Sequence, residues 1–100
     1  MIKIIAVCGM GLGSGLLARM SVERVLQKHD IKDNQFSVEV ADVGSAKRQD
    51  VDIYVTTSEF AHNLEGLSVP IVLVKNLFDE EEMDEALMPV YWEVAESKGE

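Results

Sequence analysis

The segment from Ile4 to Arg19 restricts the possible folds of this 100-residue chain more than any other segment. Its apolar, β-branched start ends at Cys8, which is the only cysteine in the protein. Four glycines fall within the next seven residues, 9–15, and an apolar pattern with helical spacing follows. This order predicts a buried strand, a tight loop and a helix.

A loop of this kind presents backbone N–H groups, and the start of the following helix adds partial positive charge, so the two together favour an anion. A thiol at the mouth of such a site is a candidate nucleophile toward a phosphoryl group. A helix N-terminus and nearby amides can lower the pKa of a thiol, which predicts a reactive Cys8. Met10 and Leu12 either pack inward or contact partner proteins.

The remaining pattern alternates strands with helices. Strands are expected at Ile2–Val7, Phe36–Ala41, Ile53–Thr56 and Pro70–Val74, and helices at Ser14–His29, Gly44–Arg48, Thr57–Leu64 and from Asp79 onward. This alternation predicts a three-layer α/β fold with a four-stranded parallel sheet in the order 2-1-3-4, covered on both faces, and with a P-loop after the first strand. Because ligands bind beyond the carboxyl ends of such strands, the cysteine loop and residues 56–58 are expected at the ligand edge.

The helix boundaries rest on local signals. Ser14 is expected to be the N-cap of the first long helix, and His29 is expected to lie near the negative end of its dipole. Asp79 and Glu82 are spaced as a variant of the capping box at the start of the last helix. Pro89 interrupts the apolar stripe of that helix, which predicts a kink or a new segment after Met88.

Composition narrows the functional class. With 47% apolar and 27% charged residues, the chain is expected to form one globular domain, residues 1–100. The lone thiol indicates a reducing, cytoplasmic compartment, and no apolar run reaches the roughly 18 residues needed for membrane insertion. A net charge of −9 argues against nucleic acid. Nine acids and one base lie from Asp79 onward, so the last helix is expected to be a solvated face or a repulsive one toward wrong partners.

Several functions compete for the cysteine loop. A dinucleotide fingerprint is weak, because 100 residues leave no room for a second mononucleotide-binding half. A nucleoside-triphosphate loop fails, because no Lys-Ser or Lys-Thr pair follows the glycines. A cysteine phosphatase has the same topology, but it would carry arginine where Ser14 stands. A phosphocarrier needs neither arginine nor a general base, since Cys8 only accepts a phosphoryl group and passes it on. A non-catalytic anion sensor with an inert thiol is a further alternative.

Other polar residues have weaker claims to the site. Thr56, Thr57 and Ser58 could donate to phosphate oxygens, although capping of the next turn is the more ordinary role. Arg19 lies about one helical turn beyond the loop and could reach a phosphate or a partner. His62 could relay phosphate or protons, although an isolated surface histidine is more often incidental.

Over essentially its whole length, the chain resembles the cytoplasmic enzyme IIB components of bacterial sugar phosphotransferase systems, of the ascorbate type within the lactose–ascorbate group. The resemblance is carried by Ile4-Ile5-Ala6-Val7-Cys8-Gly9 with Gly11, Gly13 and Ser14, by Met20, Val22 and Glu23, and more weakly by Asp52-Ile53, Val74 and Asn76-Leu77.

The resemblance implies that Cys8 takes phosphate from a phosphohistidine on a IIA component and gives it to a sugar bound by a membrane IIC component. It also implies a phosphate cradle formed by Gly9, Met10, Gly11, Leu12, Gly13 and Ser14, with no metal and no cofactor. Gly15 stands where the family often has a second small hydroxyl residue, and Met10 and Leu12 replace polar ones. These departures bear on the choice of sugar rather than on the chemistry.

Overall fold

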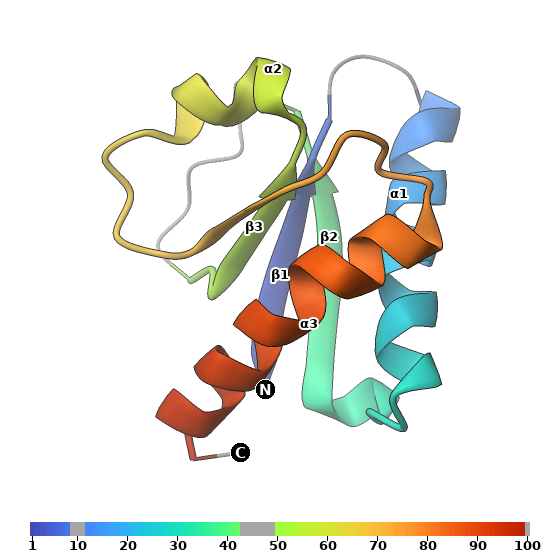
Figure 1. The fold of residues 1–100 in the computed structure, drawn as a ribbon, viewed down its shortest axis with the longest axis vertical. Helices are drawn as coiled ribbons and strands as arrows, with labels where there is room; N and C mark the ends of the chain where they lie inside the picture. The colour runs from blue at the N-terminus through green and yellow to red at the C-terminus, as the bar shows by residue number, and fades with distance from the viewer. Residues whose placement is uncertain (9–11, 43–49, 100) are drawn as a thin grey trace.

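Four parallel strands form the central sheet of the computed structural model, which describes residues 1–8, 12–42 and 50–99. The strand order is β2-β1-β3-β4, as predicted (Figure 1). The strands are β1 (Ile2–Val7), β2 (Phe36–Ala41), β3 (Ile53–Thr56) and β4 (Ile71–Leu73). The fourth strand is shorter than predicted, because it begins after Pro70 and ends before Val74. The first strand is therefore central, and its carboxyl end leads directly to Cys8.

The helices are α1 (Leu12–Lys28), η1 (Asp33–Gln35), α2 (Ser58–Ala61), η3 (His62–Leu64) and α3 (Glu80–Ser97). The predicted N-cap at Ser14 is wrong, because α1 begins two residues earlier and includes Ser14 in its first turn. The first turns of α1 pack closely on the sheet. A Cβ on Gly15 would lie 3.1 Å from Cγ1 of Val40, so the glycine lets the helix approach β2 closely. The helix predicted at Gly44–Arg48 lies outside the described residues.

The two faces of the sheet are covered differently, as the predicted three-layer fold requires. Alternate residues of the strands, together with α1 and α3, form the larger apolar cluster, which includes Ile4, Ala6 and Cys8. The intervening residues Ile5, Val7 and Tyr54 pack on the other face against Leu64 of η3 and the segment that follows it. The alternation shows which side of the sheet each strand residue faces.

The start of α3 is partly as predicted. Asp79 is the N-cap, and its side chain accepts a hydrogen bond from the Glu82 backbone at 3.2 Å. Glu82 does not complete a capping box. Its carboxylate instead accepts from the backbone N–H groups of Lys75 at 2.6 Å and Asn76 at 3.0 Å, so it fastens the loop after β4 to the first turn of α3. No second segment begins after Met88, because α3 continues through Pro89 to Ser97.

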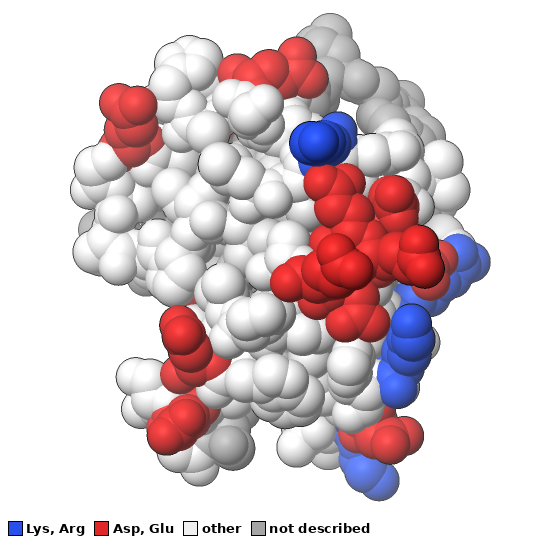
Figure 2. Space-filling model, in the orientation of Figure 1, with Lys and Arg blue, Asp and Glu red and all other residues white. Residues whose placement is uncertain are grey.

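Acidic side chains gather over the first half of α3, next to basic side chains of α1 (Figure 2). Arg24 lies 3.3 Å from Glu80, and Lys28 lies 3.5 Å from Asp84. Nε2 of His29 lies 2.9 Å from Oδ1 of Asp84, so His29, the residue directly after α1, contacts α3. The acidic face predicted to be solvated is therefore partly an inter-helix contact.

Replacing Asp84 by asparagine should weaken this contact in a pH-dependent way. The hydrogen bond with His29, and then the nearby charges of His29 and Lys28, lower the pKa of Asp84 below its ordinary value. A carboxyl whose pKa is lowered on folding stabilises the protein above its unfolded pKa, about 3.9, and loses that contribution as the pH falls through the folded value. We expect D84N to lower Tm by roughly 1–4 °C at pH 7, because the pair is largely solvent-screened.

Thermal unfolding between pH 7 and pH 2.5 tests this prediction. The Tm difference between D84N and the wild type should shrink as the pH falls below about 4, where the carboxyl begins to titrate, and disappear below the folded pKa of Asp84. The matched control is Glu85→Gln, an exposed carboxylate on the next residue of α3, which should show no such pH-dependent difference. A Tm difference for D84N that stays constant across this pH range would contradict an electrostatic origin.

Candidate functional site

Cys8 lies at the carboxyl edge of the sheet, directly after the central strand. Its backbone N–H donates to the Ala41 carbonyl at 3.3 Å, so the residue extends the pairing of β1 with β2. The side chain belongs to the larger apolar cluster and is only 8% exposed. The sulfur thus sits where the sheet meets the start of α1, almost closed off from solvent.

Burial raises the pKa of the Cys8 thiol above its ordinary value. The sequence predicts the opposite direction, from the helix N-terminus and the amides of the loop. Desolvation prevails because the sulfur is packed within the apolar cluster, where a thiolate loses its hydration. The thiol must lose its proton when it acts as a nucleophile, and burial makes that loss harder.

The predicted phosphate cradle is only partly within the described structure. Gly9, Met10 and Gly11 lie outside the described residues. Leu12, Gly13 and Ser14 form the first turn of α1, a helix of 17 residues. The first backbone N–H groups of a helix have no partners within it, so this turn can supply donors and partial positive charge to an anion. The start of α1 therefore follows the thiol after three residues.

Thr56 stabilises the strand ends around the site. Its side chain is fully buried, and its hydroxyl donates to the Val7 carbonyl at 3.0 Å, immediately before Cys8. Its own carbonyl accepts from the Val74 N–H at 3.0 Å. The hydroxyl is occupied, so Thr56 is a bridge between β1 and β3 rather than a phosphate donor. No local sequence signal predicts such a bond between residues 49 positions apart.

Thr56→Val should measure the strength of this bridge. The substitution preserves the shape of the side chain but leaves the buried Val7 carbonyl without the hydroxyl donor. We expect the free energy of unfolding to fall by about 1–3 kcal/mol. Urea unfolding monitored by far-UV circular dichroism checks the value. The matched variant Thr56→Ser retains the hydroxyl and should recover most of the loss, whereas equal losses for both variants would assign the effect to packing.

The next two residues do not cap α2 as expected. Thr57 is the N-cap by position, but its side chain makes no capping hydrogen bond, and the hydroxyl oxygen is buried without a partner in the described structure. Ser58 is exposed in the first turn of α2. The two neighbouring threonines therefore differ. The Thr56 hydroxyl is hydrogen-bonded, whereas the Thr57 hydroxyl has no partner among the described residues.

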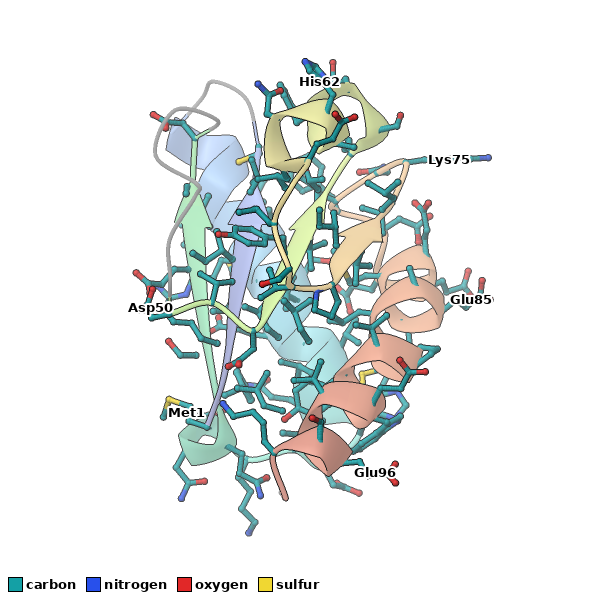
Figure 3. The ribbon with its side chains drawn as sticks, turned by 90° about the vertical axis from the view of Figure 1, so that its left-hand side faces the viewer. Met1, Asp50, His62, Lys75, Glu85 and Glu96 are labelled. Atoms are coloured by element: carbon teal, nitrogen blue, oxygen red, sulfur yellow. The ribbon has the colours of Figure 1, made fainter. Side chains whose placement is uncertain are left out.

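Two further candidates, Arg19 and His62, form no hydrogen bond or ion pair with Cys8 within the described residues. Arg19 pairs with Glu23 at 3.4 Å and lines a groove of about 440 Å³ between α1 and β2, together with Gln27 and Phe36. His62 is exposed in η3, and its ring points outward at the same end of the molecule as Lys75 (Figure 3). Neither position brings these side chains into contact with Cys8.

The described residues contain no cluster of side chains that could hold a metal ion. Across residues 1–8, 12–42 and 50–99, no three His, Cys, Asp or Glu side chains gather as a metal site. Within the same ranges, no helix combines the length and the apolar character that crossing a bilayer requires.

The fold and the Cys8 thiol define a class of small parallel α/β domain, in which a buried cysteine ends the central strand and a long helix begins just beyond it. The family "PTS system, Lactose/Cellobiose specific IIB subunit" matches residues 3–88, and the chain belongs to this family. It is also 34% identical over 95 residues to the "Ascorbate-specific PTS system EIIB component" of Mycoplasma pneumoniae, covering 89% of this chain and 94% of the relative.

These matches confirm the resemblance inferred from the sequence. The chain is a IIB subunit of the ascorbate and lactose type, a class of phosphotransferase that acts in sugar uptake. Subunits of this class work with IIA and IIC components.

Proposed function

We propose that Cys8 is the residue that carries the phosphoryl group in this IIB subunit. The observation that supports the proposal is the position of the only thiol, at the carboxyl end of the central strand and just before the start of α1. Ligands of open parallel sheets bind at this edge, and the helix start favours anions there. Gly9 to Ser14 form the cradle for the phosphoryl oxygens.

Phosphoryl transfer to Cys8 balances without a metal or an activated water. The phosphorus–nitrogen bond of a phosphohistidine on the IIA component breaks as the phosphorus–sulfur bond forms. The thiol proton passes to the imidazole nitrogen that the phosphorus leaves. In the second step the phosphorus–sulfur bond breaks, a phosphorus–oxygen bond forms on a sugar hydroxyl, and the proton of that hydroxyl returns to the sulfur.

The substrate and the partners follow from the same assignment. The donor is a IIA component, and the acceptor is a sugar held by a membrane IIC component. The name of the Mycoplasma relative indicates that an ascorbate-like compound is this sugar. The subunit carries out both transfers in the cytoplasm, where its single cysteine stays reduced.

Intact-mass measurement tests the proposal. The full chain is mixed with phosphoenolpyruvate, the general phosphotransferase proteins and a matching IIA component. We expect the mass to increase by one phosphoryl group, and we expect peptide mapping to place that group on Cys8. Absence of any mass increase, in a mixture in which the IIA component itself becomes phosphorylated, would overturn the proposal.

A further inference from the structure

Thr57 has a buried hydroxyl that no group in the described structure uses. A buried polar group without a partner costs folding free energy, so native structures keep few of them. The other such hydroxyl among the described residues belongs to Ser21, in the middle of α1 and away from the strand ends. The Thr57 hydroxyl, in contrast, lies at the carboxyl end of β3.

The strand register places Thr57 next to Cys8. β1 and β3 are parallel, with Ala6 opposite Val55. Extending the same register by two residues along both strands sets Cys8 opposite Thr57. Cys8 stays in line with β1, because its N–H donates to the Ala41 carbonyl of β2, and Thr57 keeps an extended backbone with φ −95° and ψ 164°. Adjacent strands lie about 4.8 Å apart, so these two residues are neighbours across the sheet edge.

The two side chains also emerge on the same face of the sheet. Ile53 and Val55 of β3 belong to the same apolar cluster as Ala6 and Cys8 of β1. Side chains alternate between faces, so Thr57, two residues after Val55, lies on the face that Cys8 occupies. Thr56 faces the other way, and its hydroxyl is already bonded to the Val7 carbonyl. Of the two threonines, Thr57 is therefore the one with a hydroxyl available to a group on the sulfur.

We propose that the Thr57 hydroxyl donates a hydrogen bond to a phosphoryl oxygen on Cys8, and so positions the group for transfer. The inference rests on the proposed function of Cys8, because the acceptor exists only in the phosphorylated protein. The inference accounts for the unpartnered hydroxyl of Thr57. A phosphoryl group on Cys8 carries its oxygens beyond the sulfur atom, toward the neighbouring end of β3. A hydrogen bond to a charged oxygen is stronger than one between neutral groups, so a hydroxyl desolvated in advance is well suited to this role.

Thr57→Val and Thr57→Ser form the matched pair that tests the inference. Valine keeps the shape and removes the hydroxyl, whereas serine keeps the hydroxyl. In the resting protein, Thr57→Val should unfold at or above the wild-type Tm, because the lost hydroxyl had no partner. With limiting phosphorylated IIA component, the ratio of phosphorylated to free subunit at equilibrium should fall roughly tenfold in Thr57→Val and recover in Thr57→Ser.

A spectroscopic readout separates positioning from a structural role. The phosphorus-31 chemical shift of phosphocysteine should move in Thr57→Val and stay near the wild-type value in Thr57→Ser. Ser58→Ala, which removes the neighbouring exposed hydroxyl, should change neither the shift nor the equilibrium. Should Thr57→Val not fold, Thr57→Ala provides the same comparison. An unchanged equilibrium and chemical shift in a folded variant without the hydroxyl would overturn the inference.

The failure of this inference can be told apart from a failure of the proposed function. A wild-type protein that takes up no phosphoryl group on Cys8 refutes both. A wild-type protein that is phosphorylated on Cys8, alongside a Thr57→Val variant phosphorylated equally well, refutes only the role of Thr57.

Discussion

Cys8→Ser should abolish phosphoryl transfer to the subunit. Serine places an oxygen where the sulfur stands, but a hydroxyl without an adjacent base is a far weaker nucleophile than a thiol. The rate of phosphorylation by the IIA component should fall by at least roughly 10³-fold, since removing a covalent nucleophile is among the costliest single changes in an enzyme. Quench-flow or gel-based phosphorylation assays with a fixed amount of phosphorylated IIA component measure this rate directly.

The control for Cys8→Ser is a measurement that shows the variant is still folded. Cys8 is 8% exposed within the apolar cluster, so a hydroxyl at this position loses some stability. Far-UV circular dichroism and Tm should show that the variant is folded at the assay temperature. A folded Cys8→Ser that accepts phosphate as fast as the wild type would contradict the phosphocysteine and direct attention to His29 or His62.

The same variant distinguishes a carrier from a hydrolase. A cysteine phosphatase would release phosphate steadily from a generic aryl phosphate and would lose that activity in Cys8→Ser. Ser14 occupies the position where such enzymes hold the arginine that clamps the phosphate. We therefore expect no steady release by the wild type, and phosphate uptake from the IIA component only.

Alkylation of Cys8 does not separate a carrier from an anion sensor. An inert thiol in an anion sensor would react slowly with alkylating reagents. The structure predicts slow alkylation near neutral pH for a functional thiol as well, because burial raises its pKa and limits access to the sulfur. Phosphate uptake from the IIA component is thus the experiment that separates these two functions.

Much of the fold follows from local patterns, and most differences arise from tertiary contacts. The buried runs at Ile2–Val7 and Ile53–Thr56 have the expected bounds, because period and apolar content decide such strands. The start of α1 does not, because the helix extends back to Leu12 despite the low helix propensity of the glycines there. The pKa of the Cys8 thiol is raised where the sequence predicts a lowered value. This difference also arises from tertiary contacts, since burial depends on elements distant in sequence.

The candidate site shows the same division. A thiol beside a glycine-rich turn is visible in the sequence as a unit. The different surroundings of the Thr56 and Thr57 hydroxyls are not visible in the sequence. They depend on strand register and on which face of the sheet each side chain occupies. The pairing of His29 with Asp84 across two helices is hidden for the same reason.

Pro89→Ala should stabilise the protein. Pro89 is exposed in the interior of α3, where it has no N–H to donate to the carbonyl four residues earlier and its ring crowds that carbonyl. An interior proline costs about 3 kcal/mol relative to alanine, and the stiffer unfolded chain of the proline form returns about 0.4–1 kcal/mol. We expect the free energy of unfolding to rise by about 1–3 kcal/mol, and Tm to rise by roughly 4 °C or more.

Differential scanning calorimetry of Pro89→Ala, with Glu93→Ala as the matched control, tests this prediction. Glu93 is exposed four residues further along the same helix, so its replacement should change stability by less than about 0.5 kcal/mol. A loss of stability in Pro89→Ala would show that α3 needs the proline to place Met88 and Tyr91, its buried neighbours, on the sheet.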